Sequence, residues 1–323
     1  MNIKAILVVA GEPHGIFLEI FFKSLQKKKF KKPIILVASK NLLIEQMKKL
    51  KFNFKLRLIN SKYIKTSELD NDYINLIDIE YKFSHAFQKI SNRSNSYIAK
   101  CFKTALKVIS ENKNFSLING PINKKYFLKG NSLGITEYLA KKTKTLDEVA
   151  MLIFNKELAV SPITTHLPLK DVAKNITKQK IYFHVKLINA FYKKKFKKKP
   201  RIAVTGLNPH CESNFKNSEE DLIILPTIRL LKLKKFNIDG PFPADTIFLK
   251  QNRKKFDVII GMYHDQVLAP IKAIHSFDAI NITLGLPFIR ISPDHGPNYN
   301  MIGKNKSNPQ SLINAIKFLN NKK

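Results

Sequence analysis

Three histidines occupy comparable places along the chain, each shortly after a short apolar segment that predicts a β-strand. His166 follows the segment 159–163, His210 follows 201–206, and His264 follows 257–261. Open α/β sheets bind ligands beyond the carboxyl ends of their parallel strands, so we expect the three imidazoles at one edge of a sheet. Imidazoles on separate loops suit a divalent cation and leave positions open for a substrate. The alternative is three unrelated loop or core histidines, since the spacing matches no compact metal motif.

Two carboxylates accompany these histidines. Asp265 directly follows His264, where it is either a further metal ligand or a group that orients the imidazole. Asp245 lies in a proline-framed loop that runs from Gly240 to Thr246. Both are candidates for proton transfer or for ordering water and ligands, and the sequence leaves these roles open.

A second group of polar residues predicts an anion site. Lys272 precedes Asn281, which begins a predicted strand, and Arg290 follows between two apolar residues. A guanidinium can form two parallel hydrogen bonds to a carboxylate or phosphate, and Lys272 would add a second positive charge. The amide of Asn281 could donate to the same anion. The alternative for Arg290 is a structural ion pair with Asp294.

The composition is strongly basic. Lys and Arg total 57 against 24 Asp and Glu, which gives a formal net charge of +33. Only six of these residues are Arg, whereas a dedicated nucleic-acid binder would use more Arg for phosphate and guanine contacts. We therefore attribute the charge to compositional drift and expect no specific nucleic-acid partner, a nucleic-acid-binding protein being the alternative. Two cysteines fit a reducing compartment, and no apolar run is long enough to span a bilayer, so we expect a cytoplasmic protein with no membrane segment.

Short apolar strands alternate with amphipathic helices, which predicts an α/β fold with mainly parallel strands. Besides 159–163, the predicted strands are 4–10, 33–38, 115–119, 149–154, 201–206, 257–261 and 279–284. The predicted helices are 96–111, 176–194, 219–233 and 309–319. The first turn, Gly11-Glu12-Pro13-His14-Gly15, lacks the spacing of a dinucleotide-binding loop, so we expect a tight strand-to-helix turn and no Rossmann domain.

Several segments together resemble the 4-hydroxythreonine-4-phosphate dehydrogenase family, the NAD-dependent enzymes of pyridoxal phosphate synthesis. The most specific is the run from Asn281 to Arg290 with Asp294-His295-Gly296 beyond it, and Met262-Tyr263-His264-Asp265-Gln266 is the next. The resemblance extends nearly from end to end through segments 11–15, 119–124, 134–140, 164–172, 206–210 and 240–248.

The resemblance implies a fold like the isocitrate and isopropylmalate dehydrogenases, with two α/β/α domains and mainly parallel sheets. We place the first domain at residues 1–128 plus 304–323 and the second, which carries the histidines, at 129–303. It also implies a homodimer with its active site at the subunit interface. His166, His210 and His264 match the family's three metal ligands. The family's substrate contacts match Thr136, Lys272, Asn281 and Arg290.

The implied activity is oxidation of 4-phosphohydroxy-L-threonine by NAD, or NADP, to a β-keto acid that decarboxylates to 3-amino-2-oxopropyl phosphate. One divalent ion per site, Zn, Mg or Co, is implied as well. Asp245, Asp265 and Lys272 are the candidate catalytic residues. The chain departs from the family at Ile135, where a substrate-binding His is usual, and at Glu12 and His14, where Asp and Ala are usual. Ile135 makes a sister dehydrogenase of threonate or erythronate 4-phosphate the alternative.

Overall fold

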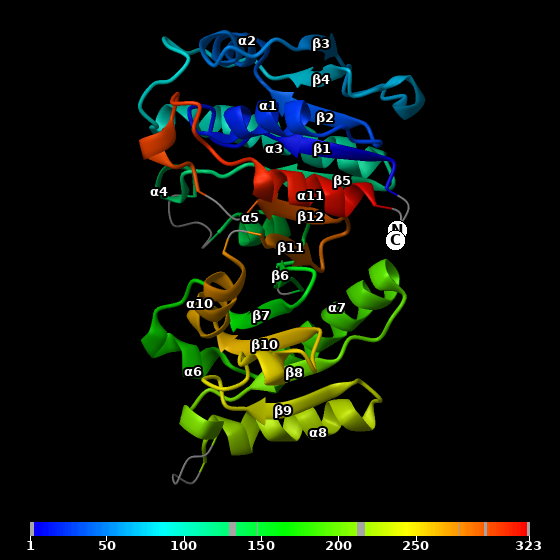
Figure 1. Ribbon diagram of the computed structural model, residues 1–323, viewed down its shortest axis with the longest axis vertical. Helices are drawn as coiled ribbons and strands as arrows, with labels where there is room; N and C mark the ends of the chain where they lie inside the picture. The colour runs from blue at the N-terminus through cyan, green and yellow to red at the C-terminus, as the bar shows by residue number, and fades with distance from the viewer. Residues whose placement is uncertain are drawn as a thin grey trace. The chain divides into compact units, whose positions relative to one another are not determined.

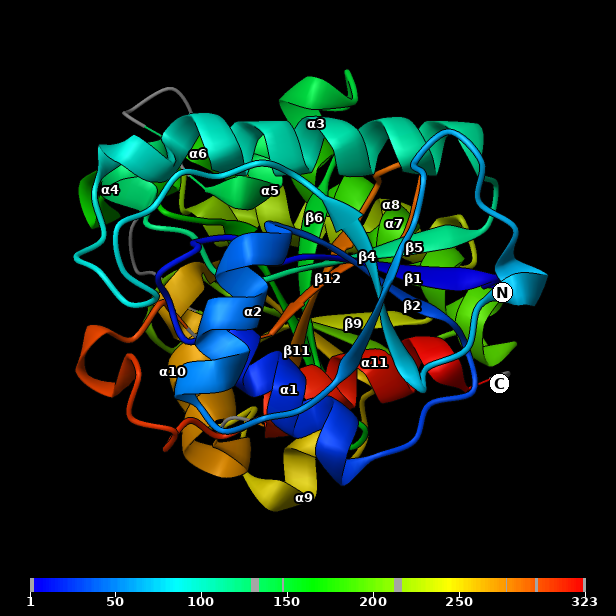
Figure 2. The same cartoon turned by 90° about the horizontal axis from the view of Figure 1, so that it is seen from above.

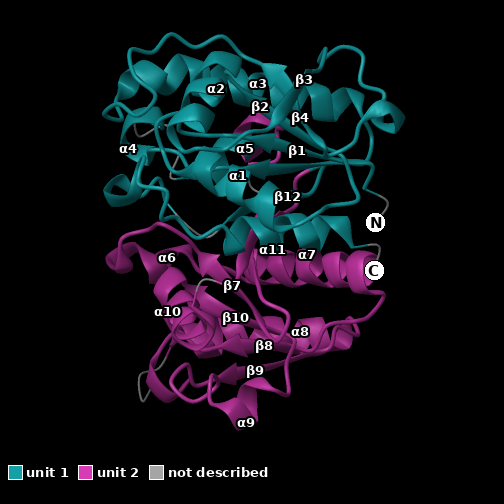
Figure 3. Cartoon of the chain, turned by 45° about the horizontal axis from the view of Figure 1, so that its top comes forward, with its two compact units in different colours: residues 1–139, 287–322 teal, residues 140–286, 323 magenta. Residues whose placement is uncertain are grey.

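The computed structural model describes residues 3–128, 134–146, 148–211, 217–276, 278–293 and 296–321. The chain divides into two compact units (Figure 3). Unit 1 comprises Met1–Leu139 and Pro287–Lys322, and Ala140–Leu286 form unit 2. Unit 2 is thus inserted into the sequence of unit 1. The domain boundaries given above stay a prediction.

Unit 1 is built on a sheet of parallel strands in the order β3-β4-β2-β1-β5-β12. Every residue of the central strands is buried, as is typical of a parallel sheet that is covered on both faces. The strands are β1 (Ala5–Val9), β2 (Ile34–Ala38), β3 (Lys55–Leu58), β4 (Tyr73–Asp78), β5 (Phe115–Asn119) and β12 (Arg290–Pro293).

Helices cover both faces of this sheet (Figure 2). Helix α3 (Asn95–Glu111) packs on β1, β2 and β5 from one side, while α1 (Phe17–Lys27), α2 (Lys40–Lys49) and α11 (Gln310–Asn320) lie on the other. Helix α4 (Lys124–Phe127) and the 3-10 turns η1 (Thr66–Glu68), η2 (Asn92–Ser94) and η6 (Tyr299–Met301) complete unit 1. Helix α5 (Ile135–Lys142) contains residues of both units.

Unit 2 contains a mixed sheet in the order β11-β6-β7-β10-β8-β9. Strands β7, β10, β8 and β9 are parallel, whereas β6 runs antiparallel to both of its neighbours. The strands are β6 (Ala150–Phe154), β7 (Ala159–Thr164), β8 (Ile202–Thr205), β9 (Ile238–Phe242), β10 (Val258–Tyr263) and β11 (Ile280–Leu284).

The helices of unit 2 pack on this sheet (Figure 1). Helix α10 (His264–His275) contacts β7 and β10, and α7 (Lys178–Phe196) contacts β6, β7 and β11. Thr177 caps α7 by accepting a hydrogen bond from the backbone of Lys180, which satisfies one of the free donors of the first turn. The other elements are η3 (Leu169–Asp171), α6 (Val172–Asn175), η4 (Pro209–Cys211), the π-helical turn η5 (Glu220–Ile224), α8 (Leu225–Leu233) and α9 (Lys250–Arg253).

The α/β class with mainly parallel strands is confirmed. All eight segments that predict strands form β-strands, with ends displaced by at most two residues. The predicted helix 219–233 forms as η5 followed by α8, so its first turn is π-helical. No helix within the described ranges is long and apolar enough to cross a membrane.

Candidate active site

The three predicted metal ligands follow three neighbouring strands of unit 2. His166 comes two residues after β7, His210 lies in η4 after β8, and His264 is the first residue of α10, directly after β10. In the sheet β10 lies between β7 and β8, and it is parallel to both. The three histidines therefore follow the same edge of the sheet, where α/β proteins bind their ligands.

His166 and His264 lie side by side. Their ring centroids are 5.8 Å apart, and the ring planes make an angle of 37°. Nδ1 of His264 is 2.6 Å from Oδ1 of Asp265. Because a carboxylate only accepts hydrogen bonds, this contact places the imidazole proton on Nδ1 and leaves the lone pair of Nε2 for a ligand. This is the contact that a group orienting His264 would make, and the role of Asp265 stays a prediction.

The backbone is left-handed at two of the three histidines. His166 has a φ of 47° and His210 a φ of 59°, and Cys211 next to it also has a φ of 59°. Non-glycine residues rarely adopt this region, and such strain concentrates at binding and catalytic sites. The loops after β7 and β8 thus hold their histidines in conformations that these residues do not favour by themselves.

The structure brings together two of the three predicted ligands. Within the described ranges, no three His, Cys, Asp or Glu side chains converge closely enough to hold a metal ion. The segment 212–216, which continues the loop of His210, lies outside those ranges. The chemistry of the paired imidazoles fits a divalent ion, and the complete triad stays a prediction.

Arg290 and Thr136, two of the predicted substrate contacts, meet in unit 1. Nη1 of Arg290 donates to Oγ1 of Thr136 at 3.2 Å, and its Nε donates to Oδ1 of Asn119 at 2.7 Å. The Arg290 side chain is completely buried. Burial lowers its pKa to about 10, while the nearby charge of Glu137 acts to raise it, so the guanidinium stays protonated at neutral pH. The alternative partner Asp294 lies outside the described residues, as does His295.

The other two predicted substrate contacts belong to unit 2. Lys272 is exposed in the last turn of α10. Asn281 is the second residue of β11, and its Oδ1 is buried without a hydrogen-bond partner among the described residues. A buried amide of this kind is a candidate for contact with a ligand. Asp245, the remaining candidate for proton transfer, is exposed in the turn after β9.

The first turn, Gly11–Gly15, holds buried polar groups that the sequence did not mark as a site. His14 Nε2 lies 3.0 Å from the hydroxyl of Tyr81, and its Nδ1 lies 3.3 Å from the carbonyl of Ala86. Burial raises the pKa of Glu12 to about 7, although hydrogen bonds from Ser94 and the His14 backbone act to lower it. The partners of His14 come from about 70 residues away in the sequence, so no local pattern could have indicated them.

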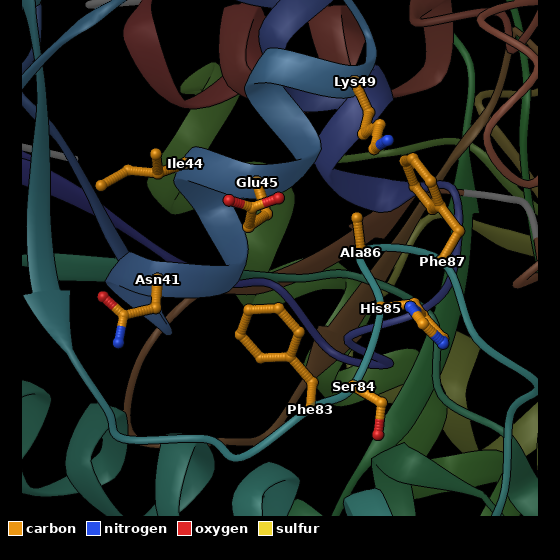
Figure 4. A pocket seen from close by; sticks show the side chains of 9 residues that line it. All are labelled: Asn41, Ile44, Glu45, Lys49, Phe83, Ser84, His85, Ala86 and Phe87. Atoms are coloured by element: carbon orange, nitrogen blue, oxygen red, sulfur yellow. The ribbon is translucent and has the colours of Figure 1, made fainter.

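A pocket of about 690 Å³ lies beside this turn in unit 1 (Figure 4). Helix α2 contributes one wall through Asn41, Ile44, Glu45 and Lys49, and the segment 83–87 contributes the other. None of the site residues predicted from the sequence lines it. The segment 83–87 is joined to α2 and the first turn by Gln46, whose amide donates to the carbonyls of Pro13 and Ala86.

Comparison with solved structures defines the class of fold. Isocitrate dehydrogenase from Methylococcus capsulatus superposes with a TM-score of 0.50 over 96% of this chain and 83% of that one, at 11% identity. 4-Hydroxythreonine-4-phosphate dehydrogenase from Klebsiella pneumoniae superposes with a TM-score of 0.82 over 98% of both chains, at 28% identity. The expected isocitrate dehydrogenase-like fold is therefore confirmed.

The sequence comparisons give the family. A family model described as pyridoxal phosphate biosynthetic protein PdxA matches residues 29–319, and the chain belongs to this family. The 4-hydroxythreonine-4-phosphate dehydrogenase of Sulfurihydrogenibium sp. is 39% identical over 96% of each chain. The D-threonate 4-phosphate dehydrogenase of Pectobacterium atrosepticum is 29% identical over 98% of each chain. The resemblance seen in the sequence is thereby confirmed.

Proposed function

We propose that this protein is an NAD-dependent, divalent-metal-dependent dehydrogenase of 4-phosphohydroxy-L-threonine. The observation that carries the proposal is the pair of imidazoles of His166 and His264, 5.8 Å apart at the ligand-binding edge of a PdxA-family fold. We assign His210, on the loop after the neighbouring strand β8, as the third ligand. A divalent ion held there would supply Lewis acidity toward the secondary hydroxyl of the substrate.

The reaction is oxidation of a secondary alcohol followed by loss of carbon dioxide. The carbinol carbon would lose a hydride, for which NAD would be the acceptor, and the hydroxyl would lose its proton, which would give a β-keto acid. The product that remains after decarboxylation is 3-amino-2-oxopropyl phosphate. Asp245 and Lys272 are the candidates for moving the protons, since Asp265 is engaged with His264.

Binding of the substrate's anionic groups falls to Thr136, Lys272, Asn281 and Arg290. Together they offer two positive charges, an amide and a hydroxyl, which suit a phosphate and a carboxylate. Their role is to fix the orientation of the carbinol carbon toward NAD. We further propose that the enzyme is a cytoplasmic homodimer with its site at the subunit interface. Light scattering should then give twice the 37.1 kDa of one chain.

A single assay tests the activity. Purified protein with a divalent ion, NAD and 4-phosphohydroxy-L-threonine should form NADH, and protein stripped with a chelator should not. No turnover above the stripped control with Zn, Mg or Co would overturn the proposal. NADP should be compared in the same assay.

One residue favours a second substrate. Ile135 begins α5 directly before Thr136, where the family usually has a substrate-binding His. An apolar side chain at this place removes one charge-assisted donor, which typically contributes about 1.5–3 kcal/mol. D-Threonate 4-phosphate, the substrate in the name of the Pectobacterium atrosepticum relative, and erythronate 4-phosphate are therefore the alternatives. The ratio of kcat/KM values for these substrates decides between them.

A further inference from the structure

A buried glutamine connects two of the strand ends that carry the histidines. Gln266 follows His264 by two residues in the first turn of α10, and its side chain turns back toward the sheet. Its Oε1 accepts hydrogen bonds from the backbone N–H of Met262 at 2.6 Å and from the hydroxyl of Thr205 at 2.8 Å. Its Nε2 donates to the carbonyl of Gly206 at 2.8 Å.

This side-chain amide extends the sheet beyond the last backbone pair. The pairing of β10 with β8 ends at Ile260 and Val204. Met262 and Gly206 lie two residues beyond this pair. The Gln266 amide accepts from the backbone N–H of Met262 and donates to the carbonyl of Gly206, as a peptide group of an intervening strand would. The ends of β8 and β10 are therefore held at a defined separation.

A second buried side chain connects β10 to its other neighbour. Thr164, the last residue of β7, donates its hydroxyl to the carbonyl of Met262 at 2.8 Å. Met262 is thus bonded through its carbonyl to β7 and through its N–H to Gln266. Met262 and Thr205 are completely buried, and Thr164 and Gln266 are 4% and 8% exposed. Hydrogen bonds that are shielded from water in this way fix geometry firmly.

The loop of His210 has an additional support. Oε1 of Glu220 accepts from the backbone N–H groups of Leu207 and Asn208 at 2.7 and 2.9 Å, and Oε2 accepts from the Asn208 side chain at 2.7 Å. Burial acts to raise the pKa of Glu220, but these hydrogen bonds together lower it, so the carboxylate is charged at neutral pH. Glu220 thus fixes the backbone at the start of the loop that carries His210.

We infer that Gln266 and Thr164 are positioning residues for the proposed metal site: they fix the ends of β7, β10 and β8, the strands that His166, His264 and His210 follow. The inference rests on the proposed metal site. Groups that orient ligand side chains typically contribute about 10–100-fold to metal affinity. Neither side chain is itself a ligand in this arrangement, because each donates a hydrogen bond to a backbone carbonyl at the end of a strand.

Matched pairs of variants test the inference in the full chain. Gln266→Met is compared with Gln46→Met, since Gln46 is also buried and its amide also forms hydrogen bonds to the backbone, donating to two carbonyls in unit 1. Thr164→Val is compared with Thr227→Val, since Thr227 is 2% exposed and donates to the carbonyl of Ile223. Both members of a pair lose comparable hydrogen bonds, so both should lower the Tm of the metal-free protein.

The deciding measurement is the Kd for Co²⁺ by calorimetry, together with the visible absorption spectrum of the bound ion. We expect Gln266→Met and Thr164→Val to weaken binding about 10–100-fold and to change the spectrum, while the two controls bind as the wild type does. Wild-type affinity and spectrum in both test variants would overturn the inference alone. If Gln266→Met does not fold, Thr164→Val decides. A wild-type chain that binds no divalent ion overturns the proposed metal site, and the inference with it.

Discussion

Nε of Arg290 lies 2.7 Å from Oδ1 of Asn119, although 171 positions separate the two residues. Arg290 begins β12 and Asn119 ends β5, and these strands pair in parallel. A guanidinium without exposed surface is stable only where its donors meet acceptors, and Asn119 and Thr136 supply two. This contact gives a physical reason for an Arg at position 290 in a chain that otherwise favours Lys.

Arg290→Lys should destabilise the protein. A lysine keeps the charge but lacks the planar fork, so it cannot donate to Asn119 and Thr136 from the same position. We expect the free energy of unfolding, measured in urea, to fall by about 1.5–3 kcal/mol. The control is Arg229→Lys, at an exposed position of α8, which should change stability by less than about 0.5 kcal/mol. Equal losses in the two variants would contradict this account of the buried contact.

His264→Ala should remove metal binding and leave the fold intact. The residue is 37% exposed, so its loss creates no buried cavity, while one of the paired imidazoles disappears. Circular dichroism should match the wild type, and calorimetry should detect no binding at concentrations of Co²⁺ that saturate the wild type. His275→Ala, at the other end of α10, is the control and should bind normally. Full activity of His264→Ala would show that the metal assignment is wrong.

Asp265→Asn should weaken the metal site without abolishing it. The carboxylate accepts from Nδ1 of His264 at 2.6 Å and so fixes the tautomer and the ring orientation. We expect an increase of about 10–100-fold in the Kd for the ion, with activity restored at higher metal concentration. Asp239→Asn, which removes an exposed carboxylate paired with Lys232, serves as the control. If activity fails to recover at saturating metal, Asp265 has a further role in proton transfer.

Glu12 should make stability depend on pH. Its pKa is raised from 4.5 to about 7 in the folded protein, so the folded state retains a proton that the unfolded state releases above pH 4.5. The stabilisation is complete below pH 4.5 and is lost as pH rises from there to about 7. Between pH 5 and 8, the wild type should lose about 2–3 kcal/mol more unfolding free energy than Glu12→Gln. His14 and the other groups titrate in both proteins, so the difference reports Glu12, and parallel pH profiles would contradict its raised pKa.

Much of the sheet could be predicted because its strands are continuous apolar runs. The strand β1 reads Ala-Ile-Leu-Val-Val, and all five residues are buried. Four of the strands, β3, β4, β9 and β12, were not predicted, and β3 and β12 depart most clearly from this pattern. The strand β3 reads Lys-Leu-Arg-Leu at the edge of unit 1, and β12 contains a buried Arg and a Pro. Whether such segments form strands depends on the side chains of the neighbouring strands, and a local sequence pattern carries no information about them.

The candidate site was predictable to the extent that it follows from strand order. The rule that parallel strands end at a common edge predicted the meeting of His166 and His264 across 98 positions. The support by Gln266, Thr164 and Glu220 was not predicted, because each makes hydrogen bonds to backbone whose position depends on the completed fold. The burial of Arg290 was not predicted either, since charged residues are rarely buried.

Because the chain returns to unit 1 after unit 2, the two units can fold in an unusual order during synthesis on the ribosome. Unit 2 is one continuous stretch, so all of its strands are available once residue 286 has been synthesised. Unit 1 still lacks β12 and α11 at that time, and until they arrive the edge of β5 and the faces of β5 and α1 that receive α11 are uncovered. Domains of nascent chains generally fold from the N-terminus onward. Here the segment inserted into the middle can be complete before the unit that contains the N-terminus.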